Sequence, residues 1–420
     1  MTEMDVLKAQ DLGAAISLES QLTNWLLVHA LPLWDRHGVD REGGGYYESL
    51  SAVGPQALVE VSGDERRGRV VARQIYVFDV GERMGWRSSF SSPVEHGCDY
   101  LFSRLSADDG LFHTSIDACT YEPLSSFSLY EHAFYLFALA RLSASATHQS
   151  RVRGAALGCL TSLRRKLGKS IGGFEEAVPA SLPLKSNPHM HLLEAAIAWV
   201  QATEGAAQRV WVELSRELIT LCLTRFRDPQ SGAIREYFDG QWMPMPGDLG
   251  RVVEPGHQFE WAWLLTEWAA SPHSSPEDQA QCLDAARQLA DLGERWGVDA
   301  NRGIAINELW DDMTPKDSSA KLWPQTERIK AWCGLLVTAR DEAARMRAGR
   351  MMATAAQGML RYLRTDVPGT WHEVCSSQGE FLLGPSKASS FYHVVCAIDV
   401  LRKTVRAHSR DMIYFAQAES

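Results

Sequence analysis

Apolar residues recur along this chain at the spacing of amphipathic helices, and short Gly-rich segments separate one helical stretch from the next. The first such segment, Gly43-Gly44-Gly45-Tyr46, runs from glycine into an aromatic residue, and similar turns recur five more times. The residues after about 406 are expected to form a tail. Helices are predicted at about 15–36, 68–84, 93–106, 128–142, 151–167, from 187, 208–227, from 257, 276–296, from 324, 342–364 and 389–406.

The turns define an internal repeat. Six helix–hairpin–helix units with a period of roughly 65 residues indicate a closed ring or an open solenoid. Every second helix is apolar over most of its circumference, as expected for buried helices, which favours closure. We therefore predict an all-α fold, an (α/α)6 barrel, with residues 1–420 forming a single domain. The turn glycines are Gly44, Gly110, Gly172, Gly232, Gly303 and Gly369.

Composition narrows the classes of partner. The hydrophobic content is 45% and the charged content 22%, which are typical of a soluble globular protein. A net charge of −10 argues against nucleic acid or an anionic membrane. No apolar run reaches the roughly 18 residues of a membrane span, and the acidic N-terminus is unlike a signal peptide. The eight cysteines are scattered without a CxxC pair, which indicates reduced thiols and predicts a cytoplasmic protein.

Polar residues gather in the first turns of the apolar helices. In a barrel these inner helices begin on the same side of the ring, so the polar clusters should converge on one cavity. Each residue could alternatively be a helix cap or a satisfied core group. His189 lies about 200° around the helix from His191, so we assign it a structural role. The converging residues are Arg73 and Tyr76; Glu131 and His132; Asn187 and His191; His257 and Glu260; Trp323, Gln325 and Glu327; and His393. The sequence places Asn187 at a helix cap, with Pro188 at the first helical position.

Metal and cofactor chemistry has little support in the sequence. His191, His257, His393 and Glu260 could meet, but no short ligand spacing such as HExxH is present. Phosphate-binding glycine loops and serine-nucleophile motifs are also missing. We predict no metal and no cofactor.

Several of these segments together resemble the N-acylglucosamine 2-epimerase superfamily, which includes cellobiose 2-epimerases and mannose isomerases. The resemblance spans residues 73 to 393 and implies an (α/α)6 barrel, in agreement with the repeat. The segments are Arg73 with Tyr76-Val77-Phe78, Asn187-Pro188-His189-Met190-His191-Leu192-Leu193-Glu194-Ala195, Pro255-Gly256-His257 with Glu260-Trp261, Trp323-Pro324-Gln325-Thr326-Glu327, and Tyr392-His393.

The resemblance implies that His257 and His393 are a catalytic acid/base pair. Arg251 looks like the arginine that isomerase-type members place near the substrate. Cellobiose epimerases carry Trp in a Gly-Pro-Trp-Lys-like run, whereas here the run is Gly384-Pro385-Ser386-Lys387, which suggests a smaller sugar. The predicted substrate-binding residues are Arg73, Asn187, His191, Arg251, Glu260, Trp323 and Glu327.

These groups suit proton transfer beside a carbonyl. A histidine can remove the C2 proton of an open-chain aldose near neutral pH. Return of the proton to C1 through a cis-enediol gives a ketose, and we predict such an isomerase, acting on a mannose-like monosaccharide. The alternative is a 2-epimerase, in which a second histidine reprotonates C2. Glu260 is expected to orient His257, and Arg73 with the inner helix N-termini to stabilise the enediolate.

Two other classes of protein fit less well. A glycoside hydrolase or lyase on the same ring would need a pair of carboxylates across the cavity, whereas this chain gathers histidines. A non-catalytic toroid would have no need for a cavity rich in His, Trp and Arg. The sequence does not separate a monomer from a homodimer.

Overall fold

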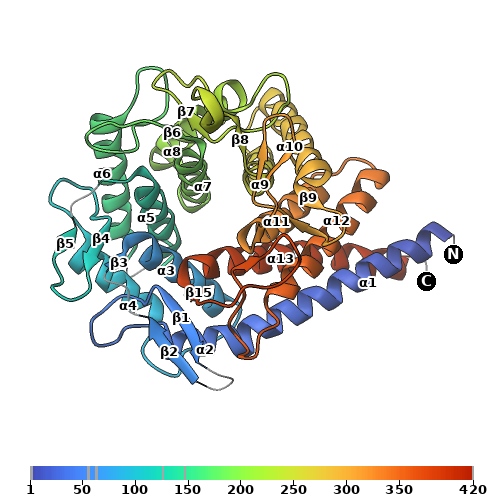
Figure 1. The fold of residues 1–420 in the computed structure, drawn as a ribbon, viewed down its shortest axis with the longest axis horizontal. Coiled ribbons are helices and arrows are strands. Elements are labelled where there is room, and N and C mark those ends of the chain that lie inside the picture. The colour runs from blue at the N-terminus through green and yellow to red at the C-terminus, as the bar shows by residue number, and fades with distance from the viewer. Residues whose placement is uncertain (1–2, 54–56, 62–64, 125–126, 146–147, 419–420) are drawn as a thin grey trace.

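Two concentric rings of helices form the body of the protein (Figure 1). The computed structural model describes residues 3–53, 57–61, 65–124, 127–145 and 148–418. The inner ring consists of α3 (Gly68–Arg83), α5 (Leu129–Leu142), α7 (Ser186–Ala202), α9 (Pro255–Ala269), α11 (Trp323–Val337) and α13 (Ala388–Ala418).

The outer ring packs around these helices, and three of its members include a π-helical turn. It consists of α1 (Glu3–Asn24) with η1 (Trp25–Ala30) and α2 (Leu31–His37); α4 (Pro93–Tyr100) with η2 (Leu101–Leu105); α6 (Gln149–Leu167); α8 (Gly205–Leu221) with η3 (Cys222–Phe226); α10 (Pro276–Gly297); and α12 (Glu342–Tyr362).

The ring is closed. Each inner helix contacts the next, and α13 contacts both α11 and α3, which joins the last repeat to the first. The first outer helix also packs on the last repeat, where Trp34 stacks on Trp371 with ring centroids 5.1 Å apart. The (α/α)6 barrel predicted from the repeat is therefore confirmed, and the open solenoid is not formed.

Short antiparallel hairpins lie at one end of the barrel and pin the starts of the inner helices. The strands directly before α3, α7, α9, α11 and α13 each pair with a strand of an adjacent hairpin. Leu184 pairs with Phe238 before α7, and Leu50 pairs with Ser386 before α13. The strand orders are β15-β1-β2 (Ser386–Lys387, Ser49–Val53, Ala57–Val61), β3-β4-β5 (Glu65–Arg67, Ser115–Asp117, Pro123–Leu124), β6-β7 (Leu184–Lys185, Tyr237–Phe238), β12-β11-β8 (Pro315–Asp317, Glu308–Trp310, Val252–Val253), β10-β9 (Ile304–Ala305, Val298–Asp299) and β13-β14 (Ala320–Lys321, Val374–Cys375).

The six repeat glycines share one backbone conformation. All of them have positive φ, between 68° and 98°, a region that L side chains rarely adopt. The glycine requirement therefore comes from the same tight turn, which is used once in every repeat.

A second repeated feature joins each hairpin to the helix that follows. His189 Nδ1 donates to the Lys185 carbonyl, and Nε2 accepts from the Phe174 N–H. His132 bonds in the same way to Ser128 and Phe112. In two later repeats a glutamine makes the equivalent pair of bonds, Gln258 to Glu254 and Ile234, and Gln325 to Lys321 and Ala305. These side chains hold the backbone of the barrel together, which is the structural role predicted for His189.

Three predicted boundaries were wrong. Helix α1 begins at Glu3, because its first turns are helical without the apolar spacing that marks a core-facing helix. Helix α13 continues to Ala418, since no Gly or Pro follows Arg406 to end it. Helix α7 begins at Ser186, because Lys185 remains extended in its strand pair, so Asn187 lies inside the first turn and is not the cap.

Membrane insertion has no support from these helices. None of them, among the residues described, is both long and apolar enough to cross a bilayer.

Candidate active site

A cavity of about 290 Å³ opens at the hairpin end of the barrel, where the inner helices begin. Its wall contains seven of the nine predicted site residues. Glu327 and Arg251 are not among them. The lining residues are Arg73, Tyr130, Asn187, His191, Glu254, His257, Glu260, Lys321, Trp323, Glu373, Val374, Lys387, Ser389, Ser390 and His393.

His257 lies on the first turn of α9 between two carboxylates. Its Nδ1 donates to Glu236 Oε2 at 2.8 Å, and Glu254 Oε2 lies 3.8 Å from the same nitrogen. Burial alone would lower the pKa of His257, but the two carboxylates outweigh it and raise the pKa to about 10. At neutral pH His257 is therefore an imidazolium and can act as an acid.

Glu260, expected to orient His257, does not make that hydrogen bond. It lies one helical turn further along α9, where Oε1 is 3.8 Å from His191 Nδ1 and 3.8 Å from Lys330 Nζ. Burial and the nearby Glu327 and Glu194 carboxylates raise its pKa well above the usual range. Glu236, which follows the Gly232 turn, takes the orienting position because β7 brings it beside the start of α7 and α9.

His393 lies on α13, where two cations, Arg73 and Lys330, act on it in addition to a carboxylate. Its Nδ1 donates to Glu327 Oε1 at 2.8 Å. Burial lowers the pKa of His393 well below 6.5, and the Arg73 and Lys330 charges lower it further. His393 is therefore neutral, with Nε2 free of the Glu327 bond and able to accept a proton. Glu327 is fully buried and touches His393 instead of lining the cavity.

Trp323 lies between the two histidines. Its ring centroid is 5.0 Å from that of His257 and 6.0 Å from that of His393. An aromatic face in this position can stack on a sugar and hold it against both imidazoles.

The Arg73 guanidinium forms no salt bridge with a carboxylate among the described residues. Its Nη2 donates to Tyr130 Oη at 2.8 Å and its Nη1 to the Ser389 carbonyl at 3.0 Å. The guanidinium lies 4.0 Å from the centroid of the Phe134 ring. A buried cation held only by neutral partners is suited to bind an anion that forms during a reaction.

The remaining wall of the cavity comes from α7. Asn187 Oδ1 is buried and accepts no hydrogen bond from the residues described. His191 Nδ1 donates to Glu194 Oε2 at 3.1 Å, and burial lowers the pKa of His191 to about 4. Both side chains can therefore serve as neutral hydrogen-bonding groups for a ligand.

The comparison with protein families agrees with this geometry. The family model of N-acylglucosamine 2-epimerase (GlcNAc 2-epimerase) matches residues 29–397. The chain belongs to the N-acylglucosamine 2-epimerase family. It is accordingly an enzyme, an isomerase or an epimerase.

Individual relatives of this epimerase-family chain cover nearly its whole length. It is 40% identical over 397 residues to a protein named mannose-6-phosphate isomerase from Rhizobium meliloti (strain 1021), spanning 92% of this chain and 97% of that one. A solved D-mannose isomerase superposes with a TM-score of 0.77 at 18% identity, covering 92% and 97% of the two chains. Cellobiose 2-epimerase from Spirochaeta thermophila DSM 6192 gives 0.74 at 22% identity, covering 94% and 98%. At these identities the solved structures support the fold alone.

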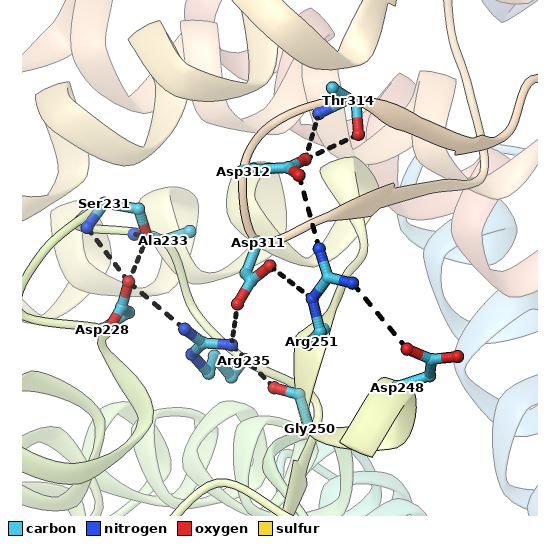
Figure 2. Close-up of polar contacts among 10 residues, drawn as sticks. All are labelled: Asp228, Ser231, Ala233, Arg235, Asp248, Gly250, Arg251, Asp311, Asp312 and Thr314. Carbon is cyan, nitrogen blue, oxygen red and sulfur yellow. Dashed lines mark hydrogen bonds and ion pairs between the residues drawn. The ribbon is translucent and has the colours of Figure 1, made fainter. Parts of the chain in front are cut away.

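Arg251 lies outside the cavity of this family member, in an outer Arg–Asp network that Figure 2 shows. Its Nε donates to Asp311 Oδ1 at 2.9 Å and its Nη2 to Asp312 Oδ2 at 3.3 Å. Arg235 reaches the other oxygen of Asp311 at 3.0 Å. The η4 turn (Gly247–Arg251) directs Arg251 toward the β11–β12 hairpin, so its guanidinium is engaged away from the substrate-sized space.

Three histidine–carboxylate groups have atoms close enough to share an ion: His191, Glu194 and Glu260; Glu236, Glu254 and His257; and Glu260, Glu327 and His393. We assign none of them as metal ligands. In each group a carboxylate already accepts from an imidazole Nδ1, and the Lys330 ammonium lies beside Glu260 and Glu327. The absence of a metal remains a prediction.

The sequence interpretation missed several lining residues. Glu254, Lys321, Glu373 and Lys387 come from strands or from the junctions between strands and helices. Tyr130 lies on α5 beside the weakly favoured Glu131 and His132, neither of which lines the cavity. One available signal was that Tyr130 falls at the same first-turn position as other polar cluster members.

Proposed function

We propose that this protein is an aldose–ketose isomerase that interconverts a mannose-type monosaccharide and its ketose, as between D-mannose and D-fructose. One observation carries the proposal: two imidazoles, each with its Nδ1 hydrogen-bonded to a carboxylate, contact Trp323 in the wall of one monosaccharide-sized cavity. The name of the relative that is 40% identical, mannose-6-phosphate isomerase, supports the same chemistry.

In the proposed mechanism, neutral His393 removes the C2 proton of the open-chain aldose through Nε2. Glu327 holds the opposite ring nitrogen, which fixes the tautomer. The electron pair moves to the carbonyl oxygen and gives a cis-enediolate. Arg73 lies in the same wall and offsets the developing negative charge.

His257 completes the proposed cycle as the acid. The imidazolium donates a proton to the oxygen at C1 as the enediol forms. His393 then returns its proton to C1 while the neutral His257 takes the proton from the hydroxyl at C2, which forms the C2 carbonyl and restores the imidazolium. Glu236 holds the His257 ring in place throughout and favours its charged form in the resting enzyme. The remaining polar wall, Asn187, His191 and Glu260, is assigned to the sugar hydroxyls.

A 2-epimerase is the second candidate, because His257 and His393 come from α9 and α13, the two inner helices that flank the helix of Trp323. If His257 loses its proton to C2 after His393 has taken one from the other face, C2 inverts without ketose formation. The same residues serve both reactions, and only the carbon that receives the proton differs.

The substrate is proposed as the free sugar or its 6-phosphate. Lys321 and Lys387 line the cavity, and no described carboxylate forms a salt bridge with either ammonium. Their ammonium groups are suited to bind the phosphate of a sugar 6-phosphate. The eight cysteines are free thiols, which supports a reducing, cytoplasmic setting for the enzyme.

The test is incubation with D-mannose, D-glucose, D-fructose and their 6-phosphates in D₂O, followed by NMR. Fructose or fructose 6-phosphate from the mannose compound, with deuterium at C1, is the expected result. Glucose formed directly from mannose with deuterium at C2 would replace the isomerase by the epimerase. If no sugar were converted and no deuterium entered any of the six compounds, both reactions would be contradicted.

A further inference from the structure

Lys330 lies beneath the cavity on α11, and its side chain is 0% exposed. Its ammonium is 2.5 Å from Glu327 Oε2 and 3.8 Å from Glu260 Oε1. The same ammonium lies 4.0 Å from the centroid of the Trp263 ring. A lysine is rarely buried unless it is paired, so the two carboxylates account for its presence in the barrel core.

The surroundings of Lys330 connect it to the proposed base. Glu327 bridges the two groups, because Oε1 accepts from His393 Nδ1 at 2.8 Å while Oε2 pairs with the ammonium. Thr326 Oγ1 adds a bond to Oε1 at 3.1 Å. The charged and titratable groups facing this point from the neighbouring helices are Arg73 on α3, His191 and Glu194 on α7, Glu260 and Glu267 on α9, Glu327 on α11, and His393 and Cys396 on α13.

We propose that Lys330 is a positioning residue that keeps Glu327 ionised and thereby holds His393 in the neutral, Nδ1-protonated form needed to take a proton from the substrate. This inference rests on the proposed function, in which His393 is the base. Lys330 does not line the cavity, so it acts through Glu327.

The physical reason is the low dielectric of the site. A buried carboxylate without a cation takes up a proton, and a protonated Glu327 would donate to His393 Nδ1 instead of accepting from it. The imidazole proton would then sit on Nε2, the nitrogen that has to be free for the substrate. The Lys330 charge also lowers the pKa of His393 directly, after burial and Arg73.

Glu260 gives the ammonium a second partner at the cavity wall. Neither Glu260 oxygen accepts a hydrogen bond from the residues described, and both are buried. One ammonium among three buried carboxylates (Glu194, Glu260 and Glu327) cannot neutralise all of them. The shorter contact goes to Glu327, whereas the pKa of Glu260 is raised well above its usual range, so Glu260 is the carboxylate suited to hold a proton.

The test compares K330M, E327Q and the double variant K330M/E327Q with the wild type. We expect K330M to lower kcat about 10- to 100-fold with KM changed less than about threefold. Its acid limb in the pH profile of kcat should move up by about one pH unit, because His393 gains basicity and Glu327 protonates more easily. If Lys330 acts through Glu327, the double variant is no slower than E327Q.

A matched control lies on the same helix. Arg328 is buried and pairs with Glu294 Oε1 at 2.6 Å, outside the cavity lining. R328M should lower thermal stability to a degree comparable with K330M while leaving the pH profile in place. A shift of the profile in R328M equal to that in K330M would reduce Lys330 to a packing role.

A second readout works without turnover. NMR of ¹⁵N-histidine-labelled protein reports the tautomer and titration of His393, and we expect K330M to convert Nδ1–H to Nε2–H or to raise the pKa. An unchanged His393 signal in K330M, or a double variant whose losses simply multiply, would overturn the proposal. If the wild type turned over no sugar, the proposed function would fail, and the NMR result would still decide whether Lys330 controls His393.

Discussion

His257 and His393 contact the same indole from different helices, yet their surroundings differ in charge. Glu236 and Glu254 both lie within 3.8 Å of His257 Nδ1. His393 Nδ1 donates to Glu327, whose other oxygen is paired with Lys330, and Glu260 lies in the same group of side chains. The pKa of His257 is raised to about 10, whereas that of His393 is lowered well below 6.5.

This difference teaches how one residue type can supply both an acid and a base at neutral pH. Burial disfavours the charged imidazole at both positions. The Glu236 and Glu254 carboxylates reverse that effect at His257, whereas at His393 the Arg73 and Lys330 charges add to it. The partners behind each ring therefore determine its role.

Removal of either imidazole should have the largest effect. H393A and H257A are each expected to lower kcat about 10²- to 10⁴-fold, because each removes one general acid or base. H393A should also abolish C2 deuterium exchange, since the base is lost, while H257A should retain slow exchange. The measurement is steady-state turnover together with NMR of the sugar in D₂O.

His189 provides a matched histidine control for these variants. Its imidazole makes two hydrogen bonds to the backbone near a hairpin, and Gln258 and Gln325 make equivalent bonds in later repeats. H189Q should therefore fold and turn over sugar like the wild type. Full activity in H393A, or equal exchange in H257A and H393A, would contradict the assigned acid and base.

Replacement of Glu236 by glutamine should reduce the difference in pKa between His257 and His393. E236Q removes one charge behind His257, so the pKa of His257 should fall and the alkaline limb of the kcat profile should move to lower pH. We expect kcat to drop about 10- to 100-fold, as for other residues that orient a catalytic histidine. The profile from pH 6 to 10 gives the measurement.

The protonation of His257 should also make the stability of the fold depend on pH. Because the folded pKa of His257 lies above 6.5, its protonation stabilises the fold fully below about pH 6.5, and this contribution is lost as the pH rises toward about 10. E236Q should flatten that part of the denaturation curve against pH. An alkaline limb that stays in place in E236Q would mean that Glu254 alone sets the charge of His257.

The fold could be predicted because its signals are local and repeated. Gly44 and its five counterparts mark one tight turn with positive φ in every repeat. The inner helices are predicted by the spacing of their apolar residues. The convergence of His257 and His393 then followed from the ring. The start of α7 was missed, since a strand pair with Phe238 sets it and no residue near Asn187 encodes that pairing.

The partners of the histidines were harder to predict. Glu236 lies in a hairpin, 21 residues before His257, and Glu327 lies 66 residues before His393. The sequence favoured Glu260 as the partner of His257 because Glu260 is one helical turn away. In the structure that turn of α9 places the Glu260 carboxylate near His191 instead of near the His257 imidazole. Side-chain pairs across repeats depend on the closed ring and have no spacing of their own.

Substitution of Arg251 should have the smallest effect on turnover. It tests whether the outer network near His257 contributes to the difference between the two histidines. Its side chain is 41% exposed and is held by Asp311, Asp312 and Asp248 outside the cavity (Figure 2). Exposed ion pairs contribute little, so R251A should change kcat/KM by less than about threefold and the melting temperature only slightly. The network joins the β11 hairpin to η4 and β8, the two elements that precede His257 in the chain. The most that we expect is therefore a small shift of the alkaline limb of the kcat profile. A tenfold or larger rise in KM would instead mean that Arg251 leaves its aspartates and contacts the bound sugar.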